Sequence, residues 1–399
     1  MSRIIANNIR HNDATVDSIT LDSAGNVSVP GNLSVTGTST LTGNTTVTGS
    51  LTANGIAYPS AGPLSNRSLI INGAMQVAQR GSVTGAQSGY GGPDRFTLTG
   101  NTAARATLSQ STDVPSGEGF TRSYGIDVTT ASGSLAAGAY HYLGYKFEGQ
   151  DLQHLKKGTS NAESVTLSFW VKSPKTGTHV IQLYDNDNTR HISKSYSVSS
   201  ADTWQKITLT FEGDTTGAFD NDNNYSLQFY WWLAAGTNYT SGTLATAWQA
   251  FAATDAAVGQ VNVLDSTDNN FYITGIQLEV GSVATPFEHR SYGDELARCQ
   301  RYYQLTEAGG GGVCTGSTGL FLNIIYSEMR DAPTIGLSAA LTINEASNNF
   351  TQSSAGISSQ TAGTTGAFLQ INNFSGLTQY RPFTVRSPDS KHFTLSSEL

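Results

Sequence analysis

Charged residues are scarce in this sequence. Asp, Glu, Lys and Arg make up 13% of the 399 residues, whereas an average globular protein contains roughly 25%. Gly, Ser, Thr and Asn fill the difference, and β-branched Thr suits strands while Lys and Glu favour helices. The composition therefore predicts an all-β protein, in a chain long enough for roughly two or three domains.

An excess of positive charge is also missing. The chain has 22 Lys and Arg against 30 Asp and Glu, which gives a formal net charge of -8, and no basic run stands out in the sequence. Proteins that bind nucleic acids neutralise phosphates with clustered Lys and Arg. We therefore expect no nucleic-acid partner.

Cysteines and long apolar runs are equally rare. Cys299 and Cys314 are too few for a disulfide framework or a zinc site, so we expect free buried thiols in a protein folded in a reducing cytoplasm. No apolar run approaches the roughly 18–20 residues that span a membrane, and MSRIIANNIR lacks the apolar stretch of a signal peptide. We expect synthesis in the cytoplasm of a cell and no membrane insertion.

A six-residue repeat is the clearest pattern that is present. Residues 25–60 read as the consecutive hexads GNVSVP, GNLSVT, GTSTLT, GNTTVT, GSLTAN and GIAYPS. Glycine opens each hexad, at positions 25, 31, 37, 43, 49 and 55, and Val, Leu or Ala stands fifth in the first five. Gly accepts positive φ at no steric cost, so each hexad predicts a very short strand followed by a turn.

One hexad has only one or two apolar residues to bury, so the repeat must pack against something else. Three identical chains wound about one axis would bring the fifth-position side chains together and leave Thr and Ser in water. This interpretation predicts a homotrimeric shaft. A left-handed β-helix, for which the stretch supplies only about two coils, and a flexible Gly/Ser/Thr linker remain as alternatives.

From Ser68 to about Arg290 the pattern changes to longer alternating strands. Apolar residues occupy every second position in 165–171, 207–211 and 227–233, and Gly275 interrupts a similar run from Phe271 to Leu278. Period-two alternation between Gly/Asn/Asp turns predicts half-buried strands, with Gly275 at a bulge. Several such strands indicate a β-sandwich of the jelly-roll type.

Several motifs in this region resemble a segment that is widespread in phage tail fibres and related phage structural proteins. They are LIINGAMQVAQRG (69–81), DRF (94–96), FEGQDL (147–152), VTLSFWVKSPKTG (165–177), TWQKITLTFEGD (203–214) and FYITGIQLEVGSVATPFEHRSYGDELARCQRYY (271–303). The similarity covers roughly half of the chain, and the fold of that segment resembles the jelly-roll carbohydrate-binding modules. The first 26 residues also resemble the start of fibre-like proteins from cyanobacterial and marine phages. The resemblance implies an appendage carried on a virus particle, without naming a receptor.

Three aromatic residues are candidates for glycan contact. Trp170, Tyr230 and Trp232 lie on strands whose opposite face is apolar, and a pyranose packs its C–H face on an aromatic ring. Large aromatic side chains are more often buried for structural reasons. Packing under a loop, a domain or another protomer is therefore the alternative for each of them.

Oxygen-rich turns raise the question of a structural calcium ion. The runs YDNDNTR (184–190) and FDNDNN (219–224) cluster carboxylates and amides. Neither matches the spacing of an EF-hand loop, and Asp/Asn-rich hairpin turns are the commoner explanation. We expect no cofactor, with calcium as the less favoured possibility.

The last quarter of the chain predicts a helix and then a small β-domain. In DELARCQRYYQ (294–304), Leu296, Cys299, Tyr302 and Tyr303 share one helical face. Four glycines at 309–312 follow, and alternation returns in 320–324, 337–343, 367–371 and 383–385. Tyr380, Arg381 and the polar stretch 344–365 are candidates for receptor contact there, without a specific chemistry.

The expected organisation has five parts. They are an attachment segment (1–24), the trimeric β shaft (25–67), the jelly roll (68–290), a helical linker (291–308) and a C-terminal β knob (309–399). The partners expected for such a chain are two further copies, a tail or baseplate protein of the virion at the N-terminus, and a glycan or other receptor on the host cell.

No enzyme motif is present in the sequence. It lacks G-x-S-x-G, a P-loop, H-E-x-x-H and C-x-x-C, and its seven histidines are scattered. Acidic pairs such as Glu279 and Glu288 exist, but a glycosidase needs two carboxylates across a sugar groove. The leading hypothesis is a non-enzymatic tail fibre that recognises the host surface. A structural head or baseplate appendage and a glycan-degrading tailspike remain as alternatives.

Overall fold

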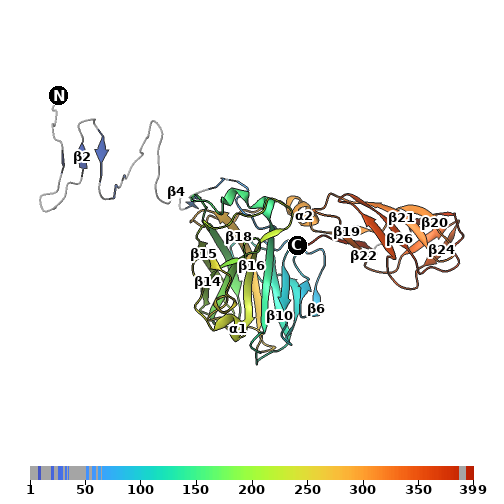
Figure 1. The fold of residues 1–399 in the computed structure, drawn as a ribbon, viewed down its shortest axis with the longest axis horizontal. Helices are drawn as coiled ribbons and strands as arrows, with labels where there is room; N and C mark the ends of the chain where they lie inside the picture. Colours follow the sequence, from blue (N-terminus) through green and yellow to red (C-terminus); the bar gives the residue numbers. More distant parts are fainter. Residues whose placement is uncertain are drawn as a thin grey trace. The chain divides into compact units, whose positions relative to one another are not determined.

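The computed structural model describes residues 65–385 and 392–399, and before them the short pieces 8–9, 19–21, 26–29, 32–33, 35, 51–53, 56–59 and 62–63. The chain divides into two units, 1–49 and 50–399 (Figure 1). All six glycines of the hexad repeat lie outside the described residues. The shaft predicted for 25–67 therefore falls mostly outside them too, and its trimeric state stays a prediction.

The first unit contains three short antiparallel strands in the order β1-β2-β3. Their bounds are β1 (Asn8–Ile9), β2 (Ile19–Leu21) and β3 (Val27–Ser28). Two of them, β1 and β2, fall within 1–24, the expected attachment segment. A two-stranded hairpin of β4 (Thr52–Ala53) and β5 (Ile56–Ala57) opens the second unit.

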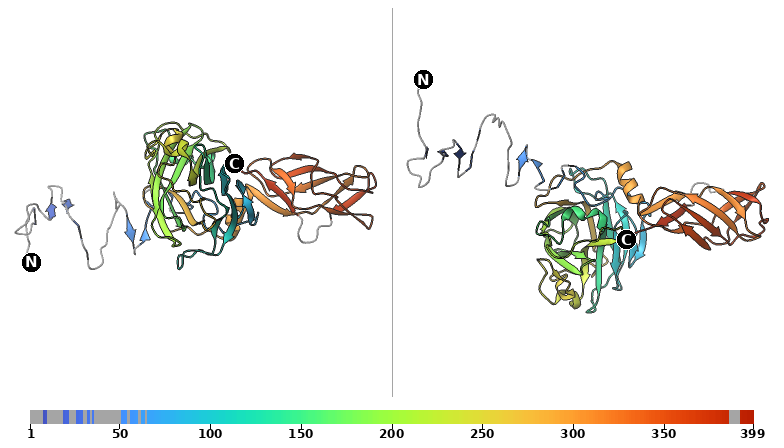
Figure 2. Two further views of the ribbon diagram at one scale, coloured as in Figure 1. Left: turned by 90° about the horizontal axis from the view of Figure 1, so that it is seen from below. Right: turned by 45° about the horizontal axis from the view of Figure 1, so that its top comes forward.

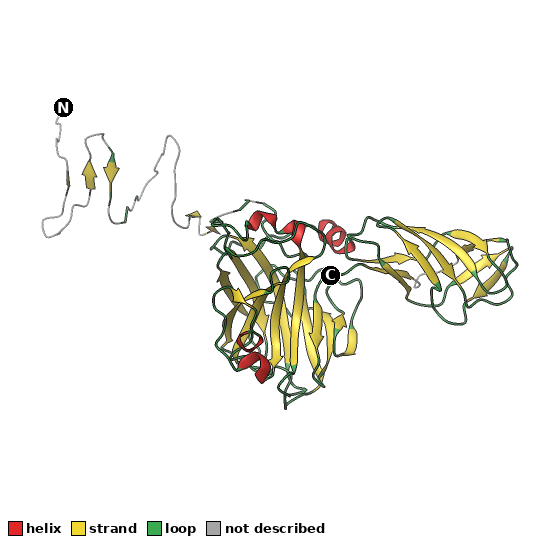
Figure 3. Cartoon of the chain, viewed as in Figure 1, coloured by secondary structure: helices red, strands yellow, loops and turns green. Residues whose placement is uncertain are grey.

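Two antiparallel sheets make up the sandwich of the second unit (Figure 3). The six-stranded sheet has the order β15-β12-β18-β10-β9-β6 and the seven-stranded sheet the order β17-β14-β13-β16-β11-β8-β7. Successive strands pass back and forth between the sheets, as in a jelly roll. The all-β sandwich predicted from the sequence is confirmed. The strands are β6 (Val83–Ala86), β7 (Gly89–Tyr90), β8 (Thr97–Gly100), β9 (Arg105–Ser111), β10 (Ser123–Thr130), β11 (Tyr140–Glu148), β12 (Val165–Lys172), β13 (Gly177–Asp185), β14 (Arg190–Val198), β15 (Gln205–Phe211), β16 (Tyr225–Ala235), β17 (Gln249–Ala250) and β18 (Asn270–Val280).

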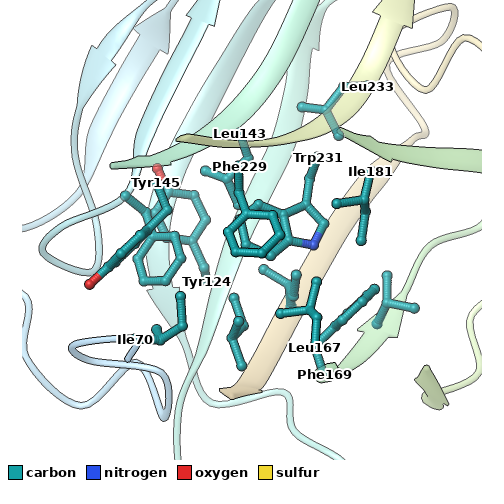
Figure 4. Packing of buried hydrophobic residues seen from close by; sticks show 14 of the residues in the cluster. Ile70, Tyr124, Leu143, Tyr145, Leu167, Phe169, Ile181, Phe229, Trp231 and Leu233 are labelled. Atoms are coloured by element: carbon teal, nitrogen blue, oxygen red, sulfur yellow. The ribbon is translucent and has the colours of Figure 1, made fainter. Parts of the chain in front are cut away.

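The core of the sandwich is built from alternate residues of these strands. Leu167 and Phe169 of β12 and Phe229 and Trp231 of β16 are buried to 2% exposure or less and belong to one cluster (Figure 4). Trp231 lies 5.2 Å from Phe229 and 6.2 Å from Phe169, measured between ring centroids. Because side chains alternate between the two faces of a strand, the neighbours of these residues point away from the core. The sandwich thus presents two outer faces, one on each sheet.

Gly275 interrupts β18 as the sequence predicts. The register between β12 and β18 shifts between Ser168 and Trp170, and Gly275 has φ +61°. A Cβ at this position would lie 2.6 Å from Cζ of Phe120. Both the backbone angle and the neighbouring ring therefore require glycine.

The helix predicted for 294–304 is shorter than expected. Helix α2 spans Tyr292–Gln300, and the Ser291 hydroxyl accepts a hydrogen bond from the Asp294 amide at its start. Tyr303 already pairs with Ser396 in the next sheet, so strand pairing overrides the helical pattern at Tyr302 and Tyr303. The other helical elements are α1 (Thr237–Thr240), η1 (Gly149–Asp151), η2 (Gln153–Leu155) and η3 (Ala253–Asp255). None of the helices in the described part of the chain is long and apolar enough to cross a membrane.

The C-terminal β-domain also has two sheets, ordered β19-β28-β22 and β24-β23-β27-β20-β21-β26-β25, around its own core. The run 337–343 predicts one strand, but β22 ends at Leu337 and β23 begins at Thr342. Cys299 and Cys314 are free and buried, as expected. The strands are β19 (Tyr303–Glu307), β20 (Gly311–Cys314), β21 (Leu320–Ile325), β22 (Thr334–Leu337), β23 (Thr342–Glu345), β24 (Asn348–Thr351), β25 (Ser359–Ala362), β26 (Gly366–Ile371), β27 (Pro382–Val385) and β28 (His392–Ser396).

The residues after β28 return to the sandwich. Glu398 is held by two arginines, with Oε2 at 2.5 Å from Arg95 Nη1 and Oε1 at 3.2 Å from Arg80 Nη1. The Arg95 guanidinium also lies 3.3 Å from the ring centroid of Tyr302. Arg95 is only 3% exposed, so its charge depends on Glu398 for compensation. Figure 2 shows the labelled C-terminus beside the sandwich.

A second buried ion cluster surrounds Lys157. Its ammonium lies 2.6 Å from Asp185 Oδ2 and 3.1 Å from Asp214 Oδ2. It also donates to the carbonyl oxygens of Thr216 (2.8 Å) and Gly217 (2.7 Å). The lysine and aspartate side chains are at most 4% exposed. Lys157 thus satisfies two carboxylates in the interior of the domain.

Replacing Lys157 with methionine should therefore destabilise the sandwich strongly. The substitution leaves Asp185 without its cation and Asp214 with Arg190 alone, and breaking a buried ion pair typically costs about 3–5 kcal/mol. The free energy of unfolding in urea measures the effect.

Lys156→Met is the matched control in that experiment. The Lys156 and Glu163 side chains are 52% and 28% exposed, and ion pairs at the surface contribute about 1 kcal/mol or less. Equal losses in the two variants would show that Lys157 does not neutralise the buried aspartates.

Candidate functional site

The outer face of the seven-stranded sheet carries a cluster of aromatic side chains. On β16, Trp231 points into the core, so Tyr230 and Trp232 point outward. Trp232 pairs with Tyr142 of β11, and Tyr230 pairs with Gln182 of β13. The register of three adjacent strands therefore brings these side chains together.

These side chains surround a hollow of about 310 Å³. Two further elements close it, because α1 contributes Tyr239 and the segment after β17 contributes Phe251. Phe251 is held there by its amide, which donates to the Thr189 carbonyl oxygen (2.9 Å). The residues that line the hollow are Tyr140, Tyr142, Gln182, Tyr184, Tyr230, Trp232, Tyr239 and Phe251.

The rings contact one another across the hollow. The ring centroids of Tyr142 and Tyr230 are 4.2 Å apart, in an edge-to-face arrangement. Trp232 lies 5.3 Å from Tyr239 and 5.7 Å from Tyr142, and Tyr184 lies 5.3 Å from Phe251. Such pairs stabilise one another beyond simple burial, so the aromatic surface is preformed.

Hydrogen bonds fix the polar groups beneath the rings. The indole N–H of Trp232 donates to Gln182 Oε1 (3.2 Å), and Gln182 Nε2 lies 3.1 Å from His191 Nδ1. Burial lowers the pKa of His191. Gln182 itself is 1% exposed. This chain of contacts holds Trp232 in one orientation.

No residue that lines the hollow is charged near neutral pH. Burial raises the pKa of Tyr142 to about 12 and also raises the pKa of Tyr230 and of Tyr239. These phenols therefore keep their protons and can both donate and accept hydrogen bonds. The hollow combines aromatic faces with neutral hydroxyl and amide groups.

The three aromatic candidates from the sequence have different positions. Tyr230 and Trp232 line the hollow, but Trp232 is 4% exposed and lies mostly under its neighbours. Trp170 lies on β12, on the outer face of the other sheet, so it does not join them. The contact of these residues with a glycan stays a prediction.

Sequence reasoning missed most of the hollow. Tyr140 and Tyr142 alternate in YHYLGYKFE with the buried Leu143 and Tyr145, so the period-two pattern could have identified them. Tyr184 follows the buried Leu183 in the same way. No sequence signal points to Tyr239 or Phe251, because they lie outside the sheet and reach the hollow through the fold.

The oxygen-rich turns have structural partners. Asp185 faces Lys157 and accepts from the backbone N–H of Asn188 (3.1 Å), and Asp187 accepts from the backbone N–H of Asp220 (2.9 Å). The described residues contain no group of three His, Cys, Asp or Glu side chains that could hold a metal ion.

The acidic pair noted in the sequence also has local partners. Glu279 accepts from the Thr285 amide (2.6 Å) and hydroxyl (2.7 Å). Glu288 accepts from the Ser68 amide (3.2 Å). Both carboxylates thus anchor the segment that follows β18.

In the C-terminal domain, Tyr380 is 78% exposed. Arg381 lies 3.8 Å from Glu345. The polar stretch 344–365 contributes β24 and β25 at the two edges of its sheet. These candidates do not converge with the aromatic hollow.

The chain shows only limited similarity to known proteins. No protein-family model and no curated protein matches the chain. A tailspike domain and carbohydrate-binding modules are among the similar solved structures. The enzymatically active domain of bacteriophage CBA120 tailspike protein 4 is 13% identical over 47% of this chain and 19% of that chain, with a TM-score of 0.27.

Carbohydrate-binding modules solved with sugars are among these structures. The family 11 module from Clostridium thermocellum, in complex with a β-1,3-1,4-mixed-linked tetrasaccharide, is 13% identical and covers 51% of this chain and 97% of that chain, with a TM-score of 0.26. TmCBM61 in complex with β-1,4-galactotriose is 8% identical and covers 54% of this chain and 99% of that chain, with a TM-score of 0.28. The chain thus spans less than a fifth of the tailspike chain and nearly all of each module.

Trp232→Ala should destabilise the protein as well as alter the hollow. The change removes a ring that is 4% exposed and leaves Gln182 Oε1 without its donor, and large-to-small changes of this kind cost about 3–5 kcal/mol. Tyr184→Ala, at a half-buried ring, should cost clearly less. Guanidinium unfolding of the two variants measures the difference, and similar losses would contradict the buried role of Trp232.

Proposed function

We propose that this protein is a non-enzymatic, homotrimeric phage tail fibre that binds a glycan on the host surface through the outer face of its seven-stranded sheet. Residues 1–24 attach it to a tail or baseplate protein of the virion. The observation that carries the proposal is the uncharged aromatic hollow around Tyr142, Tyr230 and Trp232.

The chemistry of the hollow suits a neutral saccharide. Sugar rings have apolar C–H faces and hydroxyl edges, and the hollow offers aromatic faces together with tyrosine hydroxyls. A volume of about 310 Å³ falls within the range of small-molecule sites. An acidic sugar would find no cation among the lining residues.

The same lining supports binding without hydrolysis. A glycosidase places two carboxylic acids on either side of the scissile bond, and none of the eight residues that line the hollow is Asp or Glu. Binding without cleavage is the function expected of an adhesive fibre.

The hexad repeat supports the homotrimer. Four of its described apolar residues are exposed in the single chain, with values of 62% for Val27, 73% for Leu33, 51% for Val35 and 46% for Leu51, whereas Val29 is half-buried. Burial of apolar surface drives association, and three chains wound about one axis would cover these side chains.

Replacing Tyr230 with alanine should weaken the binding of neutral oligosaccharides at least tenfold, because it removes a central ring of the preformed surface. Titration calorimetry with cellotetraose, a mixed-linked glucan tetrasaccharide and β-1,4-galactotriose measures this loss against the unmodified chain. Binding of trigalacturonate should not change in Tyr230→Ala, because none of the residues that line this hollow is a cation.

Tyr380→Ala is the matched control, because it removes an exposed tyrosine of the C-terminal domain. Loss of binding in Tyr380→Ala but not in Tyr230→Ala would move recognition to that domain. Binding to none of the neutral probes would favour a purely structural appendage, and release of reducing sugar from them would favour a tailspike enzyme.

Acidic substitutions at the fifth positions of the hexads should dissociate the trimer. In the chain with Val29→Asp, Val35→Asp and Val47→Asp, like charges would meet at the predicted axis. Light scattering should then report 42.2 kDa instead of three times that mass.

The control carries Ser28→Asp, Ser34→Asp and Thr46→Asp, which add the same charge at the fourth positions and should leave the trimer intact. A monomeric unmodified chain, or equal dissociation of both variants, would contradict the shaft.

A further inference from the structure

A second hollow lies on the opposite face of the sandwich, around Trp170. It has a volume of about 360 Å³. Trp170 belongs to β12 of the six-stranded sheet, between the buried Phe169 and Val171, so its indole points away from the core. The lining residues are Glu118, Phe120, Ser168, Trp170, Lys206, Gly275, Pro286, Phe287 and His289.

The bulge in β18 shapes one wall of this hollow. Since Gly275 has no Cβ, the Phe120 ring lies directly over the strand. Phe120 packs 5.0 Å from Phe287 and 5.4 Å from His289, and Phe287 lies 4.8 Å from His289, measured between ring centroids. Trp170 therefore shares the hollow with a fixed aromatic wall.

Four polar side chains of this hollow form no hydrogen bond within the described part of the protein. Among the described residues, none donates to or accepts from the Trp170 indole N–H, the Lys206 ammonium, the Glu118 carboxylate or the His289 ring nitrogens. Lys206 stands directly opposite Trp170 on β15. Lys206, Glu118 and His289 are exposed to solvent and Trp170 is half-buried, so these three side chains and the indole N–H are available to a ligand.

Other polar groups on the same sheet behave differently. The Trp204 indole N–H donates to Asp113 Oδ1 (2.9 Å), and Lys172 pairs with Asp113 Oδ2. These groups satisfy one another, whereas those around Trp170 remain available to a ligand. The contrast makes Trp204 a natural comparison residue.

We infer that the Trp170 hollow is a second saccharide-binding site, distinct from the aromatic hollow of the other sheet. A sugar ring lies on the Trp170 indole, and its hydroxyls bond to Lys206 and Glu118. Hydrogen bonds to charged groups are stronger than neutral ones. Because this site carries a cation, it also accepts a sugar with an acidic substituent, which the uncharged hollow does not.

The two hollows lie on opposite outer faces, since Trp231 and Phe169 of the two sheets share one core. A flat surface can touch only one of these faces at a time. Two sites of this kind raise the overall affinity where sugar chains surround the domain. The favoured target is thus a polysaccharide layer into which the sandwich enters.

The test uses saturation-transfer NMR to detect saccharide binding to the full chain and calorimetry to measure how many saccharides bind. The probes are cellotetraose, β-1,4-galactotriose, chitotriose and trigalacturonate. Tyr184→Ala combined with Tyr230→Ala removes the first hollow. This double variant should still bind at least one probe, and adding Trp170→Ala or Lys206→Ala should weaken that binding at least tenfold.

Trp204→Ala, directly before β15, is the matched control and should leave the residual binding unchanged. Trp170→Phe, which keeps an aromatic ring, should retain part of it, and equal unfolding midpoints would show that these variants fold. If the double variant binds no probe, or if its binding survives Trp170→Ala, the second site is wrong. A third outcome is that the double variant binds as well as the unmodified chain and that Trp170→Ala then abolishes this binding. That outcome would contradict the first hollow as a binding site.

Discussion

The two-residue period of strand β16 is the constraint on which the rest of the sandwich depends. Its odd-numbered residues from Leu227 to Leu233 are buried between the sheets, and Trp231 meets rings from both of them. A slip of one residue would expose this core and bury Tyr230 between the sheets. The packing that stabilises the fold therefore also fixes which aromatic side chains reach the outer face, and the neighbouring strands β11 and β13 add theirs in register.

Much of the fold was predictable because it follows from local patterns. Alternation in 165–171 and 227–233 identified strands and their buried faces, and Gly275 marked the bulge. The prediction was wrong where a distant partner decides the structure. Tyr302 and Tyr303 fit a helical face, yet Tyr303 pairs with Ser396, which lies far away in sequence. Leu337 and Ile343 read as one strand but belong to different sheets.

The candidate site was less accessible to sequence reasoning. Tyr230 and Trp232 could be named because their own strand alternates, but the sequence does not say which strands are neighbours. Trp170 was grouped with them for the same reason, although it belongs to the other sheet. Tyr239 and Phe251 reach the hollow from a short helix and a loop, whose positions depend on long-range contacts. The sequence shows directly which side chains are aromatic, whereas which of them meet in one hollow depends on contacts between distant parts of the chain.

The ion pair between Arg95 and Glu398 has a consequence for synthesis. The two residues are 303 positions apart, and at about 5–20 residues per second a ribosome needs about 15–60 s to travel between them. During that interval the sandwich strands can pair, but the Glu398 carboxylate that neutralises Arg95 in its buried position has not yet been synthesised. The arginine must stay hydrated or await its partner, so the final closure of the sandwich around Arg95 comes after translation has passed residue 398.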